Sequence, residues 1–337
     1  MTAATASSLS APVSAARDRV PFSGLLWLTW RQHRLAIVST LVAVGALAGM
    51  LYWDSADVAH SGSTTLLAMV VVPASAGLIA IFWGAPLLAR EYEQQTHLLV
   101  WSQDVSVARW LLGKIVVLAP VLVVLWAVLG SADGIVAHND WVQYPSVVSY
   151  GYSSLGFIGN QFAPFGSIGF EAWIPLQIGY VLFGFTLGLL VGALVRRTMM
   201  AIGLTLAGFV AVRILIAGVA RDHFMAPVRY LAALNSSSSP AGIATGQNVD
   251  TAPLLVNSGY LDNAGNVVDF PNACYSAQSP AATSDCLKQN GIAHPFFDYQ
   301  PVSRLATFHL IELGCYAALI AAALITLGLL VRKRRVG

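Results

Sequence analysis

Charge is what this sequence has least of. Only 10% of its 337 residues are Asp, Glu, Lys or Arg, whereas 56% are hydrophobic and the mean hydropathy is +0.67. Soluble domains carry about 25% charged residues, so this chain is too poor in charge to form an ordinary water-exposed surface. Its apolar residues lie in runs of about 20, the length at which a helix crosses about 30 Å of hydrocarbon. The composition excludes a soluble globular protein and predicts an integral membrane protein.

The motifs of several enzyme classes are also missing. The sequence has no G-x-x-x-x-G-K-[ST] phosphate-binding loop, no H-E-x-x-H zinc motif and no G-x-S-x-G nucleophile turn. Its seven histidines are scattered, and its three cysteines lack the spacing of metal ligands. Glu93 and His97 could form half of a metal site on a helix, but a solvated pair is the commoner role of that spacing. We therefore expect no catalytic residue, metal or cofactor on this chain.

Six apolar runs predict an all-α polytopic membrane protein with six transmembrane helices. Most of the 18 Lys and Arg residues fall on one side of these spans. The positive-inside rule places that side, with both termini, in the cytosol, and the protein in the plasma membrane. Large extracellular segments are then expected at 131–171, between the third and fourth spans, and at 221–304, between the fifth and sixth. The predicted spans are 35–53, 64–88, 111–130, 172–195, 198–220 and 305–331.

Two different stretches precede this six-helix domain, which we assign to residues 35–337. Residues 1–20 are rich in Ala and Ser and lack the basic start and apolar centre of a signal peptide, which favours a disordered tail. Residues 21–34 combine Leu and Trp with a basic end, the composition of a helix that lies in the membrane interface. A simple anchor for the first span is the alternative interpretation of 21–34.

The cysteines agree with the predicted orientation. Cys274 and Cys286 share the second extracellular segment, where the setting is oxidising, and we expect them to form a disulfide. Cys315 falls within the last span, where a packing role is the simplest interpretation.

Two charges fall inside predicted spans. Arg213 and Glu312 each lie roughly 10 Å below the outer end of their span at 1.5 Å per residue. Charges at such depth are usually paired or face a cavity, so we predict an Arg213–Glu312 ion pair between the fifth and sixth spans. In the alternative, Arg213 extends outward to the interface, and Glu312 is protonated or bonded elsewhere.

Glycines repeat every four residues on one face of the fourth span, which lets helices approach closely. They are Gly184, Gly188 and Gly192, and Gly45 and Gly49 repeat in the same way on the first span. Both faces suit packing within the chain or a contact between two copies.

Residues 89–110 form the only sizeable loop predicted on the cytosolic side. Its first half has the apolar spacing of a short helix with an acidic exposed face, and Ser106 is placed to cap a second helix. Such a helix between the second and third spans can dock a cytosolic partner, or it can simply close the base of the two spans.

This loop carries a family resemblance. The pattern Arg90-Glu-x-Glu93-x-x-Thr96, followed by Trp101-Ser-Gln, Arg109-Trp-Leu and Lys114, resembles the coupling region of ABC-2 type transporter permeases, and of their actinobacterial branch in particular. Similar motifs extend over most of the chain. They are Thr29-Trp-Arg-Gln-His-Arg34, Ile174-Pro175, Arg196-Arg197-Thr198, Tyr299-Gln-Pro301 and Ile311-Glu312.

The resemblance implies the permease subunit of an ATP-driven exporter. Its partners would be two copies of a separate ATP-binding cassette subunit, which bind ATP and Mg, and a second permease copy or homologue in the lipid bilayer. The expected substrate is amphipathic, lipid-like or antibiotic-like, and no nucleic-acid partner is expected. The residues implied to couple to the ATPase are Arg90, Glu91, Glu93, Thr96, Trp101 and Arg109.

The chain departs from the family pattern in two places. Gln95 stands where relatives often have glycine, and the stretch 131–171 is longer than in many of them. A second hypothesis therefore stays open, namely a membrane anchor or sensor whose extracellular segments bind a ligand while the cytosolic helix holds a signalling partner.

Overall fold

The computed structural model describes most of the chain. The described residues are 21–55, 67–95, 106–143, 161–234, 253–277 and 279–333.

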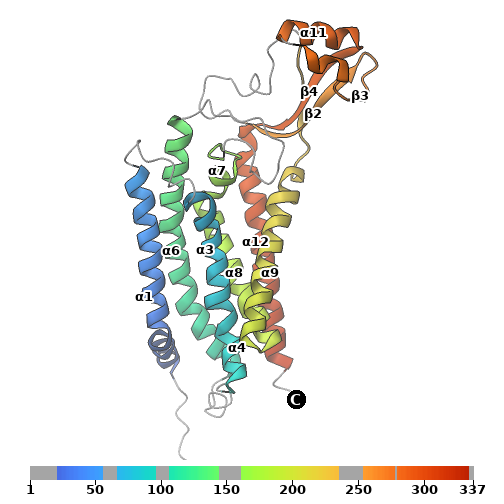
Figure 1. Cartoon of the computed structure of the whole chain (residues 1–337). Coiled ribbons are helices and arrows are strands. Elements are labelled where there is room, and N and C mark those ends of the chain that lie inside the picture. The colour runs from blue at the N-terminus through green and yellow to red at the C-terminus, as the bar shows by residue number, and fades with distance from the viewer. Residues whose placement is uncertain are drawn as a thin grey trace, which may run out of the picture.

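Six helical spans, each long and apolar enough to cross a membrane, run side by side in the described part of the chain (Figure 1). The prediction of an all-α polytopic membrane protein is thus confirmed. The first, third and fourth spans are α1 (Phe22–Ser55), α6 (Val107–Gln143) and α8 (Ile174–Val195). The second joins η2 (Leu67–Val71), α3 (Val72–Ile79), η3 (Ala80–Gly84) and α4 (Ala85–Glu93). The fifth joins α9 (Thr198–Leu215), η4 (Ile216–Ala220) and η5 (Arg221–His223), and the sixth joins η7 (Val302–Arg304) and α12 (Leu305–Lys333).

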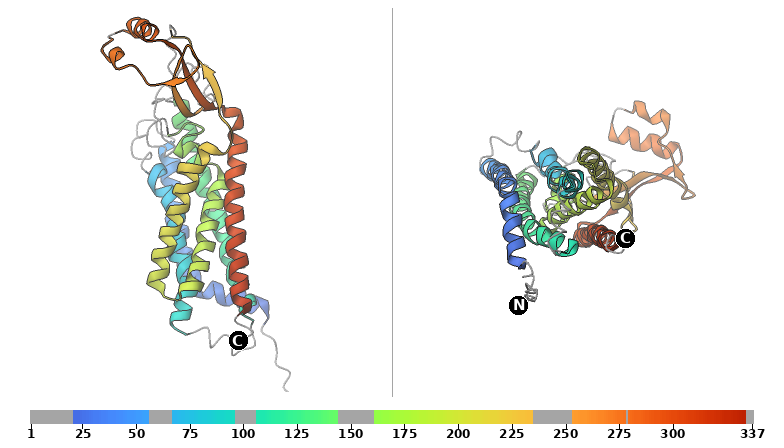
Figure 2. Two further views of the ribbon diagram at one scale, coloured as in Figure 1. Left: turned by 90° about the vertical axis from the view of Figure 1, so that its right-hand side faces the viewer. Right: turned by 90° about the horizontal axis from the view of Figure 1, so that it is seen from below.

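Two helices are longer than the spans predicted from the sequence. The stretch 21–34 and the first span form one helix, α1, whose first part lies across the lower end of the bundle (Figure 2). Helix α6 continues to Gln143, so the stretch 131–171 does not begin as a loop after the span. It continues because Ala132, Val136 and Ala137 keep the helical spacing and are buried in the core.

Helix α8 lies at the centre of the bundle, in contact with the second, third, fifth and sixth spans, whereas α1 packs on α6. Its glycines permit a very close approach to the second span. A Cβ added at Gly188 would lie 2.6 Å from the backbone oxygen of Ala80, and one at Gly192 would lie 2.5 Å from that of Ala85. The glycine face of α8 therefore makes a contact within the chain.

A small sheet stands beyond the helices at the upper end in Figure 1. Its strands β1 (Val228–Leu231), β2 (Leu254–Asp262), β3 (Val267–Val268) and β4 (Ile292–Gln300) are antiparallel in the order β1-β4-β2-β3. Helix α11 (Pro280–Gln289) packs against it. A large extracellular segment at 221–304 was expected, but the sheet within it was not predicted.

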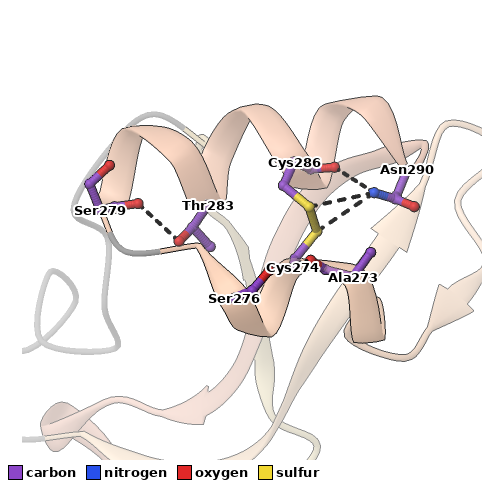
Figure 3. The surroundings of a disulfide bond; sticks show 7 residues. All are labelled: Ala273, Cys274, Ser276, Ser279, Thr283, Cys286 and Asn290. Carbon is purple, nitrogen blue, oxygen red and sulfur yellow. Dashed lines mark hydrogen bonds between the residues drawn. A yellow bond between two sulfur atoms is a disulfide. The ribbon is translucent and has the colours of Figure 1, made fainter.

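The disulfide joins the two helical elements of this unit. Cys274, in η6 (Asn272–Ser276), is bonded to Cys286 on α11 (Figure 3). The side-chain amide of Asn290 lies 3.6 Å from each sulfur and donates to the Cys286 carbonyl at 2.8 Å. The cross-link thus fixes η6 against α11, beside the buried Leu287 and Ile292.

We call the end of the bundle that carries the sheet the sheet end. The opposite end, where α1 begins and α12 ends, is the terminal end (Figures 1 and 2). At the sheet end Gln300 donates to the Met225 carbonyl at 2.6 Å, and Arg304 donates to that of Ala226 at 2.8 Å. These bonds hold the start of the sixth span against the segment that leaves the fifth.

Candidate functional site

The region that resembles a coupling helix lies at the terminal end. Helix α4 ends at Glu93, and Gln95 follows with a left-handed φ of 55°. Glycine adopts this conformation without strain, whereas a residue with a Cβ adopts it at a cost. The predicted coupling residues Thr96 and Trp101 lie outside the described residues.

Glu91 ties α4 to the third span. Its carboxylate forms an ion pair with the Lys114 ammonium of α6, and Lys114 is only 1% exposed. The ammonium also lies 4.1 Å from the centre of the Trp110 ring. Since a buried cation without a partner is costly, the pair fixes the end of the second span to the start of the third.

Glu93 ties the same helix to the fifth span. One of its carboxylate oxygens accepts hydrogen bonds from the backbone N–H of Thr198, at 3.0 Å, and from the Thr198 hydroxyl, at 2.6 Å. Thr198 is the first residue of α9, so a negative charge caps a helix N-terminus. Arg196 adds a cation–π contact, its guanidinium 5.6 Å from the centre of the Tyr92 ring.

The remaining coupling candidates differ in exposure. Arg90 is exposed on α4. Arg109 is partly buried near the start of α6, where its guanidinium lies 5.9 Å from the Phe22 ring centre. Its backbone N–H donates to the Ser106 hydroxyl at 3.3 Å, the cap expected from the sequence. Glu91 and Glu93, which we expected to face an ATPase, have partners within the chain, whereas Arg90 is open to a partner protein.

A cluster of four charged side chains lies near the sheet end. Arg221 of η5 donates through Nε and Nη2 to Glu312 of α12, at 2.9 Å and 3.1 Å, and lies 3.5 Å from Glu171. Glu171 closes α7 (Ser167–Glu171) and also pairs with Arg213 of α9. Glu312 is fully buried. We call these four residues the charge cluster.

The predicted Arg213–Glu312 pair belongs to this cluster, but neither residue is the other's nearest partner. Arg213 Nη1 lies 4.0 Å from Glu312 Oε1, while the shorter contacts are Arg213 to Glu171 and Arg221 to Glu312.

Aromatic rings enclose the two guanidinium groups. The Tyr180 hydroxyl donates to Glu312 at 2.8 Å, and the Arg213 guanidinium lies 3.9 Å from the centre of the Tyr180 ring. The Arg221 guanidinium lies 4.0 Å from the Phe170 ring. Buried charges are tolerated when each is paired and hydrogen-bonded, so the cluster can hold α7, α8, α9 and α12 together.

Comparison with known proteins assigns the chain to a family. The model of the family described as "ABC-2 membrane transporter related" matches residues 52–221, half of the chain. The chain belongs to this family. No curated protein and no solved structure matches it. It is therefore an ABC-2 type permease, a transmembrane subunit that is not itself catalytic and whose ATPase activity lies on separate subunits.

The matched range contains both regions described above. It includes α4 with its contacts to α6 and α9, and it ends at Arg221 of the charge cluster. The sheet and α12 of the permease lie outside it. Among the described residues, no three His, Cys, Asp or Glu side chains are grouped in a way that could hold a metal ion.

Three partners in these contacts, Glu171, Arg221 and Lys114, were not predicted from the sequence. Glu171 and Arg221 are adjacent to predicted span ends and were assigned to the extracellular segments. Glu171 and Arg221 carry opposite charges next to the ends of the fourth and fifth spans, and this could have predicted that they pair. Lys114 had been included in the family motif, but its burial against Glu91 depends on how two helices pack.

Proposed function

We propose that this permease exports an amphipathic, lipid-like or antibiotic-like substrate across the plasma membrane. Two copies of a separate ATP-binding cassette subunit would dock at the terminal end and supply the energy. A second permease copy or a homologous permease would complete the complex. The observation that carries the proposal is that α4 is tied to two other spans at that end.

The distribution of charge supports the orientation. Exposed arginines at the terminal end include Arg34, Arg90 and Arg197, and the positive-inside rule assigns such an end to the cytosol. The disulfide Cys274–Cys286 belongs to the opposite end, in agreement with an oxidising exterior.

The contacts of α4 suggest how a push would spread. Movement of an ATPase against α4 and the loop after it acts on α6 through Glu91–Lys114. It acts on α9 through Glu93–Thr198. Because α6 and α9 are held to α4 at the terminal end, the push would tilt these helices and change the distances between the spans. In this scheme Glu91 and Glu93 are positioning residues that hold α4 against α6 and α9. Arg90 would contact the ATPase directly.

The substrate class follows from the surfaces that a cargo would meet. The spans are apolar, and the predicted extracellular stretch 131–171 is rich in aromatic residues and has no Lys or Arg. Such surfaces suit a molecule with a large apolar part and a polar group.

Co-purification tests the docking part of the proposal. The permease, extracted in mild detergent from its native host, should retain a P-loop ATPase in stoichiometric amount. Arg90→Glu should lose it. Arg34→Glu, which reverses an exposed charge on α1 at the same end, should retain it and serves as the matched control.

The outcomes separate the two hypotheses for the chain. An ATPase lost only from Arg90→Glu supports docking at α4. If no ATPase is recovered from wild type even after cross-linking, the exporter proposal fails, and an anchor or sensor that binds its ligand through the sheet becomes the better explanation. Stimulation of the ATPase by candidate amphipaths in the reconstituted complex then tests the substrate class.

A further inference from the structure

A buried carboxylate lies beside the charge cluster, at the contact of α6 and α8. Asp133 of α6 and Gln177 of α8 are each only 1% exposed. Glycine makes this contact close, because a Cβ at Gly130 would lie 3.3 Å from Cγ of Gln177 and 3.4 Å from Cα of Ile174. Asp133 is thus enclosed where α6 and α8 pack closely.

The hydrogen bonds of this pair are incomplete. Nε2 of Gln177 donates to Asp133 Oδ2 at 3.3 Å and to the Glu171 carbonyl at 3.0 Å. Asp133 Oδ1 and Gln177 Oε1 are both buried and have no hydrogen-bond partner among the described residues. Turning the amide over would only place Oε1 against two other acceptor oxygens. The site therefore lacks a donor and has acceptors in excess.

The charges of the surrounding region are also unbalanced. Asp133 and the charge cluster together hold three carboxylates, Asp133, Glu171 and Glu312, against the two guanidinium groups of Arg213 and Arg221. If every group were ionised, one negative charge would be left without a partner in a buried setting. Further titratable groups on the elements packed around this region include His138 and Asp140 of α6, Tyr52 of α1, Tyr180 of α8, and His309 and Tyr316 of α12.

Of these groups, His309 is the buried histidine that could balance the charge. Its Nε2 lies 3.1 Å from the Phe170 carbonyl, and its ring stacks on Trp173 with the ring centres 4.7 Å apart. A neutral histidine with its proton on Nε2 satisfies that bond. A second proton on His309 would correct the charge but would leave the oxygens of Asp133 and Gln177 without a donor.

We propose that Asp133 carries a proton at neutral pH and that the Asp133–Gln177 pair is a one-proton site between α6 and α8. The Oδ1 hydroxyl then donates to Gln177 Oε1 while Nε2 donates to Oδ2, which closes the hydrogen-bonded ring of a carboxylic acid and a primary amide. One proton supplies the missing donor and makes the region neutral. Loss of the proton places an unpaired carboxylate inside the contact, so the packing of α6 on α8 responds to pH.

Infrared difference spectroscopy tests this proposal on the full-length permease in lipid nanodiscs. Wild type at neutral pH should show the C=O stretching band of a protonated, hydrogen-bonded carboxylic acid, which shifts in D₂O. Asp133→Asn should lack this band and should still fold, because asparagine has the shape and neutrality of the protonated acid. Asp262→Asn, at an exposed turn of the sheet, is the matched control and should keep the band.

Three results of these measurements on wild type and Asp133→Asn would overturn the proposal, and a fourth comes from the melting temperatures below. The first is the absence of a protonated carboxyl band in wild type at neutral pH, and the second is the same band in Asp133→Asn. The third is failure of Asp133→Asn to fold, since it would mean that an ionised carboxylate is required. Melting temperatures measured in Na⁺ and K⁺ series add an independent check. If Asp133 is protonated, the melting temperature should depend on neither ion. A sodium-dependent rise in the melting temperature that Asp133→Asn abolishes would identify a metal cation in place of the proton.

Discussion

Removing one partner of the buried Arg221–Glu312 pair gives the strongest prediction on stability. Arg221→Met keeps a long side chain but takes both hydrogen bonds from Glu312, which is fully buried. The carboxylate then keeps only the Tyr180 hydroxyl and a guanidinium 4.0 Å away.

The size of the effect follows from the buried position. Leaving one charge of a buried pair without its partner costs about 3–5 kcal/mol. With about 2 °C of melting temperature per kcal/mol for a large domain, the expected fall is roughly 6–10 °C. The double variant Arg221→Met with Glu312→Gln should recover most of this loss, because it removes both charges and leaves Glu171 paired with Arg213.

A matched pair in the sheet tests whether burial is the cause. Arg229 donates to Asp298 through two bonds of 2.7 Å each, but its side chain is 48% exposed. Ion pairs on the surface contribute little to folding stability, so Arg229→Met should lower the melting temperature much less than Arg221→Met. The assay is thermal unfolding of the detergent-purified protein, followed by tryptophan fluorescence. Equal falls in the melting temperatures of the two single variants would refute burial as the cause, and so would a double variant no more stable than Arg221→Met.

Three further predictions concern the backbone and the disulfide. Gln95→Gly should raise stability by about 1 kcal/mol, because Gln95 has a φ of 55°, and a lower melting temperature would contradict this. Gly188→Ala should lower stability by about 1–3 kcal/mol, since its Cβ meets backbone at 2.6 Å, whereas Gly45→Ala, with open space around it, should be neutral in the same unfolding assay. Replacing Cys274 and Cys286 by Ser should expose the sheet to limited proteolysis while the helices stay resistant, and cleavage within the spans would count against this separation.

The sequence predicted the helical architecture because long apolar runs leave few other structures in a bilayer. It also identified charged residues that make contacts between the spans, among them Glu91, Glu93, Arg213 and Glu312. Their partners were harder to predict, because Lys114 and Thr198 come from other spans and the pairing depends on how helices rotate against each other. A charge on a helix surface looks the same in sequence whether it faces an ATPase or a neighbouring span.

The sheet at 228–300 was not predicted for a related reason. Strand β1 pairs with β4 across more than 60 residues of sequence, as Val228 opposite Tyr299 shows, and no local signal fixes such a pairing. The central strand β4 contains Pro295 and is buried on both sides near Phe296 and Phe297, so it lacks the alternation of a surface strand.

Site-directed cross-linking tests the central claim that α4 couples this permease to a separate ATPase. In a Cys315→Ala background, a cysteine at the exposed position Gln94 should cross-link to a P-loop ATPase in native membranes. A cysteine at Val267, which is 64% exposed on the sheet, should not. A cross-link at position 94 alone agrees with docking at the terminal end. Its absence there, or an ATPase cross-linked at position 267, would contradict the account.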